Sequence, residues 1–320
     1  IEQLRLRRRR EHTVVVGLGW LGLPLVESLA DAGRPVVAVS LGMDAEAVAS
    51  VRRSRVPVVE GDARDAAVLR EARVDRADSL VVLAGSDGTN AEVALAAGHL
   101  AESRDTPLTC LAHIRDPGLC QALRAEELGR ERRTFHLEFF NVAERAARLM
   151  LEEHGAFVLD PGPATIGVVG GTDVAEAVVV EAARARRVRL GRRLDVVVAG
   201  DPAVSEGWAG RHPGLRRAAR FRHVAGPPGP LDDAAVDALA GTGAVFICLD
   251  ADTAAIAAAL EAAARIESIP VIVPLGEWGG LSAILTSGSA TLRRIHPFMV
   301  FPRILDLDVL LVGTREILAK

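Results

Sequence analysis

Three glycines near the amino end of the chain have the spacing of a phosphate-binding turn. The β-branched run Thr13–Val16 leads directly into residues 17–22, whose sequence is G-L-G-W-L-G. In this pattern the first glycine permits a tight turn, the second admits a phosphate, and the third lets a helix pack against its strand. The unpaired N–H groups and positive dipole end of that helix attract an anion. The pattern therefore predicts a nucleotide pyrophosphate site.

The glycines need a strand before them and a helix after them, and the surrounding sequence provides both. Short apolar runs alternate with amphipathic segments, as in right-handed βαβ units of a parallel sheet. The runs are apolar on both faces, which a sheet covered on both sides by helices requires. Asn90 is the predicted N-cap of its helix. Strands are expected at 13–16, 35–40, 56–60, 79–84 and 108–114, and helices at 21–32, 45–53, 66–72 and 90–101.

The same pattern restarts after a predicted connecting helix. Asn141 and Glu144 have the spacing of a capping box, and an amphipathic segment follows them. Residues 15–19 align with 168–172, which indicates an internal repeat at a spacing of roughly 150 residues. Further strands are expected at 164–169, 194–199, 223–225, 244–249 and 270–274, and helices at 174–185 and 254–265. The predicted fold class is α/β, with two Rossmann-like doubly wound parallel-sheet domains joined by a connecting helix.

Length and composition agree with two domains. The chain has 320 residues, a net charge of -4 and 49% hydrophobic residues, and domains of about 100–200 residues are usual. We expect five segments, which are a basic linker at 1–11, a first domain at 12–137, the connecting helix at 138–155, a second domain at 156–285 and a C-terminal segment at 286–320.

Composition also argues against several classes of function. Near-neutral charge and 3% aromatic residues disfavour a nucleic-acid partner, which would need a basic stripe and stacking platforms. Three cysteines without metal-ligand spacing are expected to be buried thiols in a reducing compartment, so we predict no metal site. No apolar run reaches the ~18–20 residues of a membrane span.

The first half resembles the regulator of potassium conductance domain, also called the TrkA-N or KTN domain. The resemblance covers residues 12–100 and is carried by short motifs in a fixed order. They are the glycine turn, V-V-E-G-D-A at 58–63, R-A-D at 76–78 before an apolar strand, and S-D-G-T-N at 86–90. The second half is similar to a degenerate copy of the same domain.

The resemblance implies a cytoplasmic sensor without catalytic residues. Domains of this family bind a nucleotide or an ion and pass a conformational change to a membrane pore. We therefore expect NAD(H) or another adenine nucleotide as ligand, and a homodimer or larger ring as the assembly. The expected partner is a potassium channel or transporter, with the same polypeptide upstream of Ile1 as one place for it. The expected location is the cytoplasm, at the inner face of the membrane.

Ser40 departs from the pattern of NAD-binding domains. It ends the second predicted strand, where an acidic residue usually holds the ribose hydroxyls. A serine leaves NADP, an adenine mononucleotide or another anion open as ligand. Asp62 is a second candidate for the adenosine side, and Arg115 follows the fifth strand. The predicted binding residues are Gly17, Leu18, Gly19, Trp20, Leu21, Gly22, Ser40, Asp62, Ala63, Ala84 and Arg115.

The second half has lost features of the glycine turn. Thr172 stands at the position of the second glycine, where its side chain fills the space of a phosphate, and Asp173 adds negative charge. We expect this turn to be structural, with Asp201 as a weak candidate for a ribose contact.

Two other functions remain open. An NAD(P)-dependent oxidoreductase needs an acid–base side chain. Tyrosine is absent and the only lysine is Lys320, which leaves His113 and His136 as candidate bases. His113 is expected to be a packed core residue instead. The third function is a ligand-free assembly adaptor. For assembly, we expect the apolar segment 139–151 to form an interface, with packing inside its own domain as the alternative.

Overall fold

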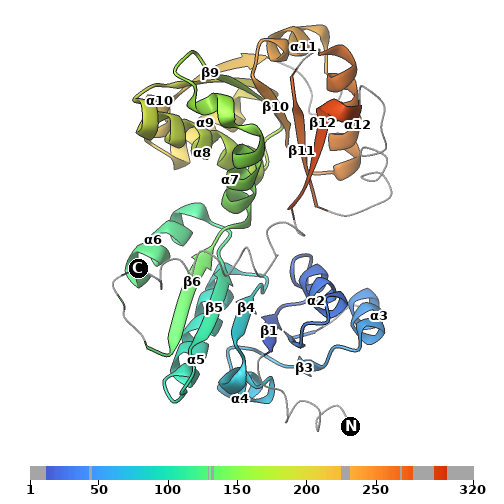
Figure 1. The fold of residues 1–320 in the computed structure, drawn as a ribbon, viewed down its shortest axis with the longest axis vertical. Helices are drawn as coiled ribbons and strands as arrows, with labels where there is room; N and C mark the ends of the chain where they lie inside the picture. The colour runs from blue at the N-terminus through green and yellow to red at the C-terminus, as the bar shows by residue number, and fades with distance from the viewer. Residues whose placement is uncertain are drawn as a thin grey trace. The chain divides into compact units, whose positions relative to one another are not determined.

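The computed structural model describes residues 12–42, 45–128, 130, 133–224, 231–266, 269–276 and 292–300. The chain divides into two compact units, one that ends at Val142 and one that begins at Ala143. Each unit is an α/β fold built on a single sheet (Figure 1). The predicted basic linker at 1–11 lies outside the described residues.

The first unit contains a six-stranded sheet with the order β3-β2-β1-β4-β5-β6. All of its pairings are parallel. The chain adds strands on one side of β1 and then returns to add β4 on the other, which is the doubly wound Rossmann arrangement. The strands are β1 (Thr13–Val16), β2 (Val36–Ser40), β3 (Val58–Glu60), β4 (Ser79–Val82), β5 (Leu108–His113) and β6 (Phe135–Phe140).

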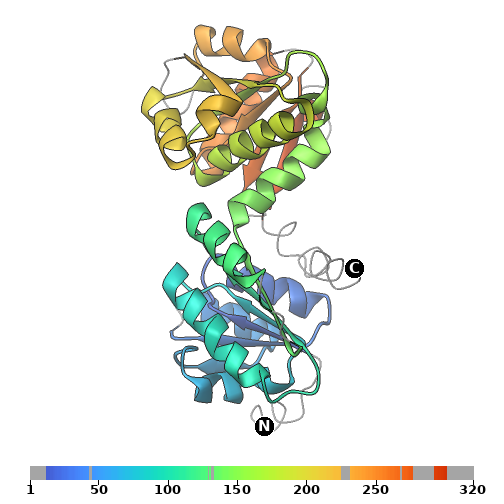
Figure 2. The same cartoon turned by 90° about the vertical axis from the view of Figure 1, so that its left-hand side faces the viewer.

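Helices on both sides of this sheet bury its apolar faces (Figure 2). The core is made largely of valine, leucine and alanine side chains from the central strands and from the helix after β4. The helices are α2 (Gly22–Asp31), α3 (Ala45–Ser54), α4 (Ala66–Glu71), α5 (Asp87–Ala101), α6 (Pro117–Glu127) and the 3-10 helix η1 (Val74–Arg76).

The sequence patterns did not predict α6 or β6. The middle of β6, residues 136–138, is partly exposed, so β6 lacks the continuous apolar run of a central strand. Its last residues, Phe139 and Phe140, are 5% and 0% exposed; Phe139 belongs to the first core, and the Phe140 ring lies 5.5 Å from that of His113. The alternative given for segment 139–151, packing inside its own domain, thus agrees with the contacts of these two residues, and an interface role of the rest of the segment stays a prediction.

The second unit repeats the architecture of the first. Its six-stranded sheet has the order β12-β11-β10-β7-β8-β9, again with parallel pairings only. Counted from β7, this is the same strand order as in the first unit. The strands are β7 (Thr165–Val169), β8 (Leu194–Ala199), β9 (Ala219–Val224), β10 (Ala244–Ile247), β11 (Val271–Leu275) and β12 (Ile295–Met299).

The connecting helix α7 (Val142–His154) begins one residue after Asn141 and starts the second unit. The edge strand β12 comes from the region expected to be a separate C-terminal segment. It contains Pro297, which is tolerated at a sheet edge but masks a strand signal. The other helices are η2 (Ala156–Leu159), α8 (Asp173–Leu190), α9 (Pro202–Arg211), α10 (Leu215–Ala218), α11 (Asp233–Ala240), α12 (Asp252–Arg265) and η3 (Leu292–Arg294).

The three cysteines are buried and form no disulfide. Burial raises the pKa of the Cys110 thiol well above its usual range and that of Cys248 to about 12, so both are protonated and unreactive near neutral pH. The expectation of buried thiols is confirmed. Among the described residues, no helix combines the length and apolar character needed to cross a bilayer.

Candidate functional site

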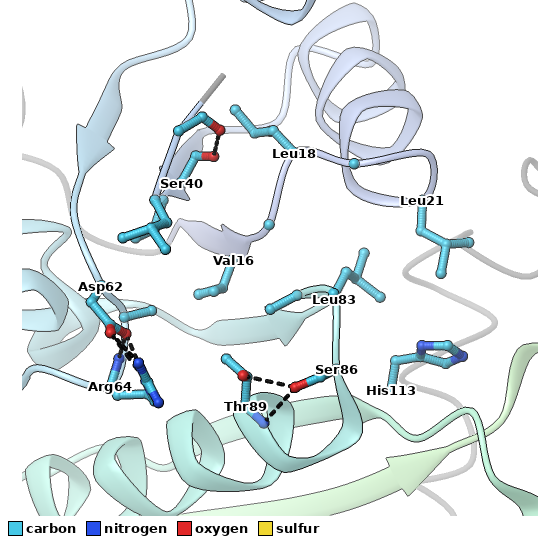
Figure 3. Close-up of a pocket in the computed structure, with 18 of the residues that line it drawn as sticks. Val16, Leu18, Leu21, Ser40, Asp62, Arg64, Leu83, Ser86, Thr89 and His113 are labelled. Atoms are coloured by element: carbon cyan, nitrogen blue, oxygen red, sulfur yellow. Dashed lines mark hydrogen bonds and ion pairs between the residues drawn. The ribbon is translucent and has the colours of Figure 1, made fainter. Parts of the chain in front are cut away.

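A cavity of about 880 Å³ opens at the carboxyl ends of the first sheet (Figure 3). It lies where the strand order reverses between β1 and β4, the usual ligand position in doubly wound sheets. The structure brings ten of the eleven predicted residues together around it, and only Gly22 is outside the lining. The ten are Gly17, Leu18, Gly19, Trp20, Leu21, Ser40, Asp62, Ala63, Ala84 and Arg115.

The three glycines of the turn have different constraints. Gly17 has φ +91°, and a Cβ there would lie 2.5 Å from the carbonyl oxygen of Leu83. A Cβ at Gly22 would lie 1.7 Å from the carbonyl oxygen of Gly17, so the third glycine allows α2 to pack onto the turn. At Gly19 a Cβ would meet no atom within 4 Å. The second glycine therefore borders open space in the cavity.

The amino end of α2 makes this space favourable for an anion. The first turn of α2 carries no acidic residue, and no side chain caps its N-cap residue, Leu21. The Leu23 N–H already donates to the Gly19 carbonyl oxygen at 3.0 Å, and Pro24 has no N–H, so it is chiefly the positive dipole end of α2 that stabilises negative charge here. A phosphate group would fit both the open space beside Gly19 and the charge of the helix end.

Ser40 lines the cavity at the end of β2. Its hydroxyl donates a hydrogen bond to the carbonyl oxygen of Gly42 at 2.6 Å. Because that bond uses its single proton, Ser40 offers only lone pairs to a ligand. The structure therefore permits Ser40 to accept a hydrogen bond from a ribose hydroxyl and leaves it no proton to donate.

Asp62 and Arg64 form an exposed ion pair at one end of the cavity (Figure 3). The carboxylate accepts from Nη2 of Arg64 at 2.6 Å, from Nε at 3.0 Å and from the Arg64 backbone N–H at 2.9 Å. These hydrogen bonds lower the pKa of Asp62 to about 2, so it is ionised at neutral pH. Arg64 also contacts Glu92 at 3.3 Å. The sequence patterns did not single out Arg64, although it lies two residues after Asp62.

Asn90 fixes the backbone at the other side of the cavity. Its Oδ1 accepts from the N–H of Ala84 at 2.8 Å, and its Nδ2 donates to the carbonyl oxygens of Ala84 at 3.2 Å and His113 at 2.8 Å. The predicted N-cap role of Asn90 is wrong, because α5 begins at Asp87 and Ser86 is its N-cap. Asn90 lies inside the helix, and its side chain joins the backbone that follows β4 to the end of β5 by hydrogen bonds.

Replacing Asn90 with leucine should destabilise the first unit by about 2–4 kcal/mol, because three buried backbone groups would lose their partner. Chemical denaturation measures this change. Thr89→Ala is the control, since Thr89 is one helix position away, is only partly buried and should change stability by less than about 0.5 kcal/mol. Equal effects of the two substitutions would contradict the role assigned to Asn90.

The loop after β5 positions Arg115. The Asp87 carboxylate accepts from the backbone N–H of Arg115 at 2.7 Å and of Asp116 at 3.0 Å. From the other side, the Asn141 amide donates to the carbonyl oxygens of Ile114 at 3.0 Å and Arg115 at 2.7 Å. These bonds hold the backbone from which Arg115 lines the cavity.

His113 lies at the end of the cavity opposite Asp62 and Arg64 (Figure 3). It is 8% exposed, and its ring centroid lies 5.5 Å from that of Phe140. Burial lowers its pKa, which keeps the imidazole neutral at pH 7. His113 is thus packed, as expected, and also lines the cavity, whereas His136 lies in β6 outside the lining.

The further lining residues Ser86, Asp87 and Thr89 come from the start of α5 and were not predicted.

The corresponding turn of the second unit is filled by protein. Gly170 has φ +96° and approaches the Cys248 carbonyl closely, as Gly17 approaches Leu83. A Cβ at Gly171 would lie 2.8 Å from Cγ1 of Val204, which belongs to the first turn of α9. Gly171 corresponds to Leu18, and the position of Gly19 is taken by Thr172, the next residue. Helix α9 therefore covers the second turn.

The charge and the helix capping at this turn also differ from those at the glycine turn of the first unit. Thr172 is the N-cap of α8, and the first turn of α8 carries Asp173 and Glu176. Glu176 accepts from Nε of Arg211 at 2.9 Å and from Nη2 at 2.5 Å, which fastens α9 to α8. Asp201 accepts from the N–H of Ala203 at 2.8 Å as the N-cap of α9. The structure thus gives Asp201 a capping role at the place proposed for a ribose contact.

The model of the TrkA-N domain family matches residues 13–130. A comparison with curated protein sequences gives no match. Among solved structures, the GsuK channel is 16% identical, with a TM-score of 0.60 over 97% of this chain and 70% of that chain. The GsuK RCK domain is 13% identical, with a TM-score of 0.61 over 97% of this chain and 78% of that chain. The GsuK channel bound to NAD is also 13% identical, with a TM-score of 0.61 over 97% of this chain and 65% of that chain.

The likeness to these structures shows the fold, two Rossmann-like domains in one chain. The TrkA-N model matches most of the first unit, which carries the cavity described above. The second unit shares the strand order of the first and completes the fold seen in the GsuK RCK domain.

Proposed function

We propose that this chain is a cytoplasmic nucleotide-sensing module that regulates a potassium channel or transporter. The observation that carries the proposal is the cavity of the first unit, where the open position at Gly19 faces an uncapped helix end. The proposed assembly is a homodimer or larger ring. The chain would act on a pore through conformational change and would catalyse no reaction.

The cavity favours an adenine nucleotide as ligand. The diphosphate would lie against the glycine turn, and Ser40 would accept from a ribose hydroxyl. Arg115 contributes a guanidinium to the lining, whereas the charge of Arg64 is paired with Asp62 and Glu92. Structures named as GsuK bound to ADP and to NAD support this class of ligand, because they share the fold. The proposed ligand is therefore NAD(H) or another adenine nucleotide.

A direct structural link leads from the cavity to the connecting helix. Arg115 lines the cavity, and its carbonyl oxygen accepts from the amide of Asn141, the residue immediately before α7. A ligand that contacts Arg115 would therefore affect the position of the residues at the start of α7. A ligand shifts a conformational equilibrium only by its differential affinity for the two states, and couplings of about 1–3 kcal/mol are typical.

A thermal-unfolding series with ADP, NAD, NADH, NADP and NADPH tests the proposal. A ligand at 100 times its Kd should stabilise the protein by about 2.7 kcal/mol. Nicotinamide absorbance is followed in parallel with candidate substrates. Stabilisation without turnover supports the sensor. Turnover would instead support an oxidoreductase with His113 as its candidate base, and no response to any nucleotide would support a ligand-free adaptor.

We predict one nucleotide per chain, bound to the first unit. In the second unit, Thr172, Asp173 and Val204 fill or charge the place of the phosphates. Calorimetric titration with the nucleotide that binds most tightly should give a stoichiometry near one. A stoichiometry of two would contradict the assignment of a structural role to the second turn.

A further inference from the structure

The second unit has an unusual concentration of arginine at the end of α8. Between Glu181 and Asp195 the sequence contains six arginines and no acidic residue. One of them, Arg186, is buried, and its guanidinium donates only to backbone carbonyls. The other five are exposed, namely Arg184, Arg187, Arg189, Arg192 and Arg193.

A second group of arginines lies beside the first. Helix α10 and the start of β9 contribute exposed Arg216, Arg217 and Arg220. Helix α10 packs against α8, and Nε of Arg193 donates to the carbonyl oxygen of Arg217 at 3.0 Å. The two groups therefore adjoin at Arg193 and are taken together as one surface. We call it the arginine surface, made of Arg184, Arg187, Arg189, Arg192, Arg193, Arg216, Arg217 and Arg220.

Few carboxylates neutralise the arginine surface. Within the part of the chain that the structure describes, its ion pairs are Arg184 with Glu181 at 3.9 Å and Arg220 with Asp195 at 3.5 Å. Exposed pairs at such distances contribute little. Arg187 and Arg192 donate to the carbonyl oxygens of Gly191 and Pro161, contacts that leave their charge intact. The surface is therefore strongly positive, although the whole chain has a net charge of -4.

A structural role accounts for only part of this charge. Basic residues in the last turn of a helix stabilise its dipole, which explains Arg187 and Arg189. It does not explain Arg216, Arg217 and Arg220, which lie outside α8. Nor does it explain Val188, which is 76% exposed among the arginines of α8.

We propose that the arginine surface docks on an anionic lipid bilayer. Clusters of four to eight basic residues are typical of surfaces that bind acidic lipids, and an exposed apolar side chain among them suits the headgroup region. Nucleic acid is a weaker fit, because stacking on aromatic side chains usually accompanies such binding and the chain has 3% aromatic residues. The proposal is independent of nucleotide binding by the first unit.

Cosedimentation of the full chain with lipid vesicles tests the proposal. Vesicles of phosphatidylcholine with about 30 mol% phosphatidylglycerol should bind the protein, and pure phosphatidylcholine vesicles should not. Binding should fall steeply as salt is raised to about 0.5 M. Each arginine near an anionic surface contributes about fivefold, so the triple variant Arg189→Gln, Arg216→Gln, Arg217→Gln should lower the partition coefficient roughly 100-fold.

The matched control removes the same charge elsewhere. Arg53, Arg70 and Arg148 are exposed residues of α3, α4 and α7, and their replacement by glutamine should change binding by less than about threefold. Circular dichroism verifies that both triple variants fold. Absence of binding to anionic vesicles would overturn the proposal. So would equal losses in the two variants, or tighter binding to a mixed-sequence oligonucleotide than to the vesicles.

Discussion

Gly19→Asp should lower the affinity for a nucleotide at least about 100-fold, equivalent to about 2.7 kcal/mol, while the protein remains folded. A Cβ at Gly19 meets no protein atom within 4 Å, so the new side chain has room in the folded state. Its carboxylate would occupy the space proposed for the diphosphate and would place like charges side by side. Calorimetric titration with ADP and with NAD measures the loss.

Gly19→Ala is the matched control for that substitution. It adds the same Cβ without charge, so its effect on affinity should be much smaller than that of aspartate. Circular dichroism and thermal unfolding should report a native fold for both variants. Unchanged affinity in Gly19→Asp would contradict the placement of the phosphates at this turn.

Arg186→Ala should destabilise the second unit by about 3–5 kcal/mol, because the hydrogen bonds of a charged donor to buried carbonyls would be lost. Arg186 is 1% exposed. Its Nε donates to the Arg193 carbonyl at 2.9 Å, and its Nη1 donates to those of Val158 at 2.7 Å and Asp160 at 3.0 Å. Its Nη2 donates to the Gly162 carbonyl. One side chain thus fastens the segment between α7 and β7 to α8.

Denaturant unfolding of the purified chain measures this effect. Arg189→Ala is the control, because Arg189 is exposed on the same helix and its removal should cost less than about 0.5 kcal/mol. Arg186→Lys should recover only part of the loss, since an ammonium group lacks the planar fork that reaches several carbonyls at once. A loss below about 1 kcal/mol in Arg186→Ala would show that the segment is held by other contacts.

The fold was predictable where the sequence has a strong local signal. Central strands such as β1, β4 and β10 are fully buried, so their apolar runs stand out. The edge strands β6 and β12 lie at the ends of their sheets and carry partly exposed residues, so their patterns are weaker. Helix α9 was missed because its residues are mixed in polarity and its position depends on packing against α8.

The position of the site was predictable for a similar reason. Carboxyl ends of neighbouring parallel strands meet at one edge, which brings Gly19, Ser40, Asp62 and Arg115 around one cavity. Sequence patterns could not predict contacts that depend on the conformation of loops. The ion pair of Arg64 with Asp62 and the packing of Val204 on Gly171 are of this kind. The roles of the lining residues in binding stay predictions.

Hydrogen–deuterium exchange with and without ADP or NAD tests the central claim most directly, because it reports where a nucleotide acts along the chain. We predict slower exchange at residues 17–22, 40–42, 61–64 and 84–89, which border the cavity of the first unit, and no direct protection at 170–175. Unchanged exchange at 17–22 with saturating ADP and NAD, or protection at 170–175 in its place, would contradict the claim that the first unit is the nucleotide sensor.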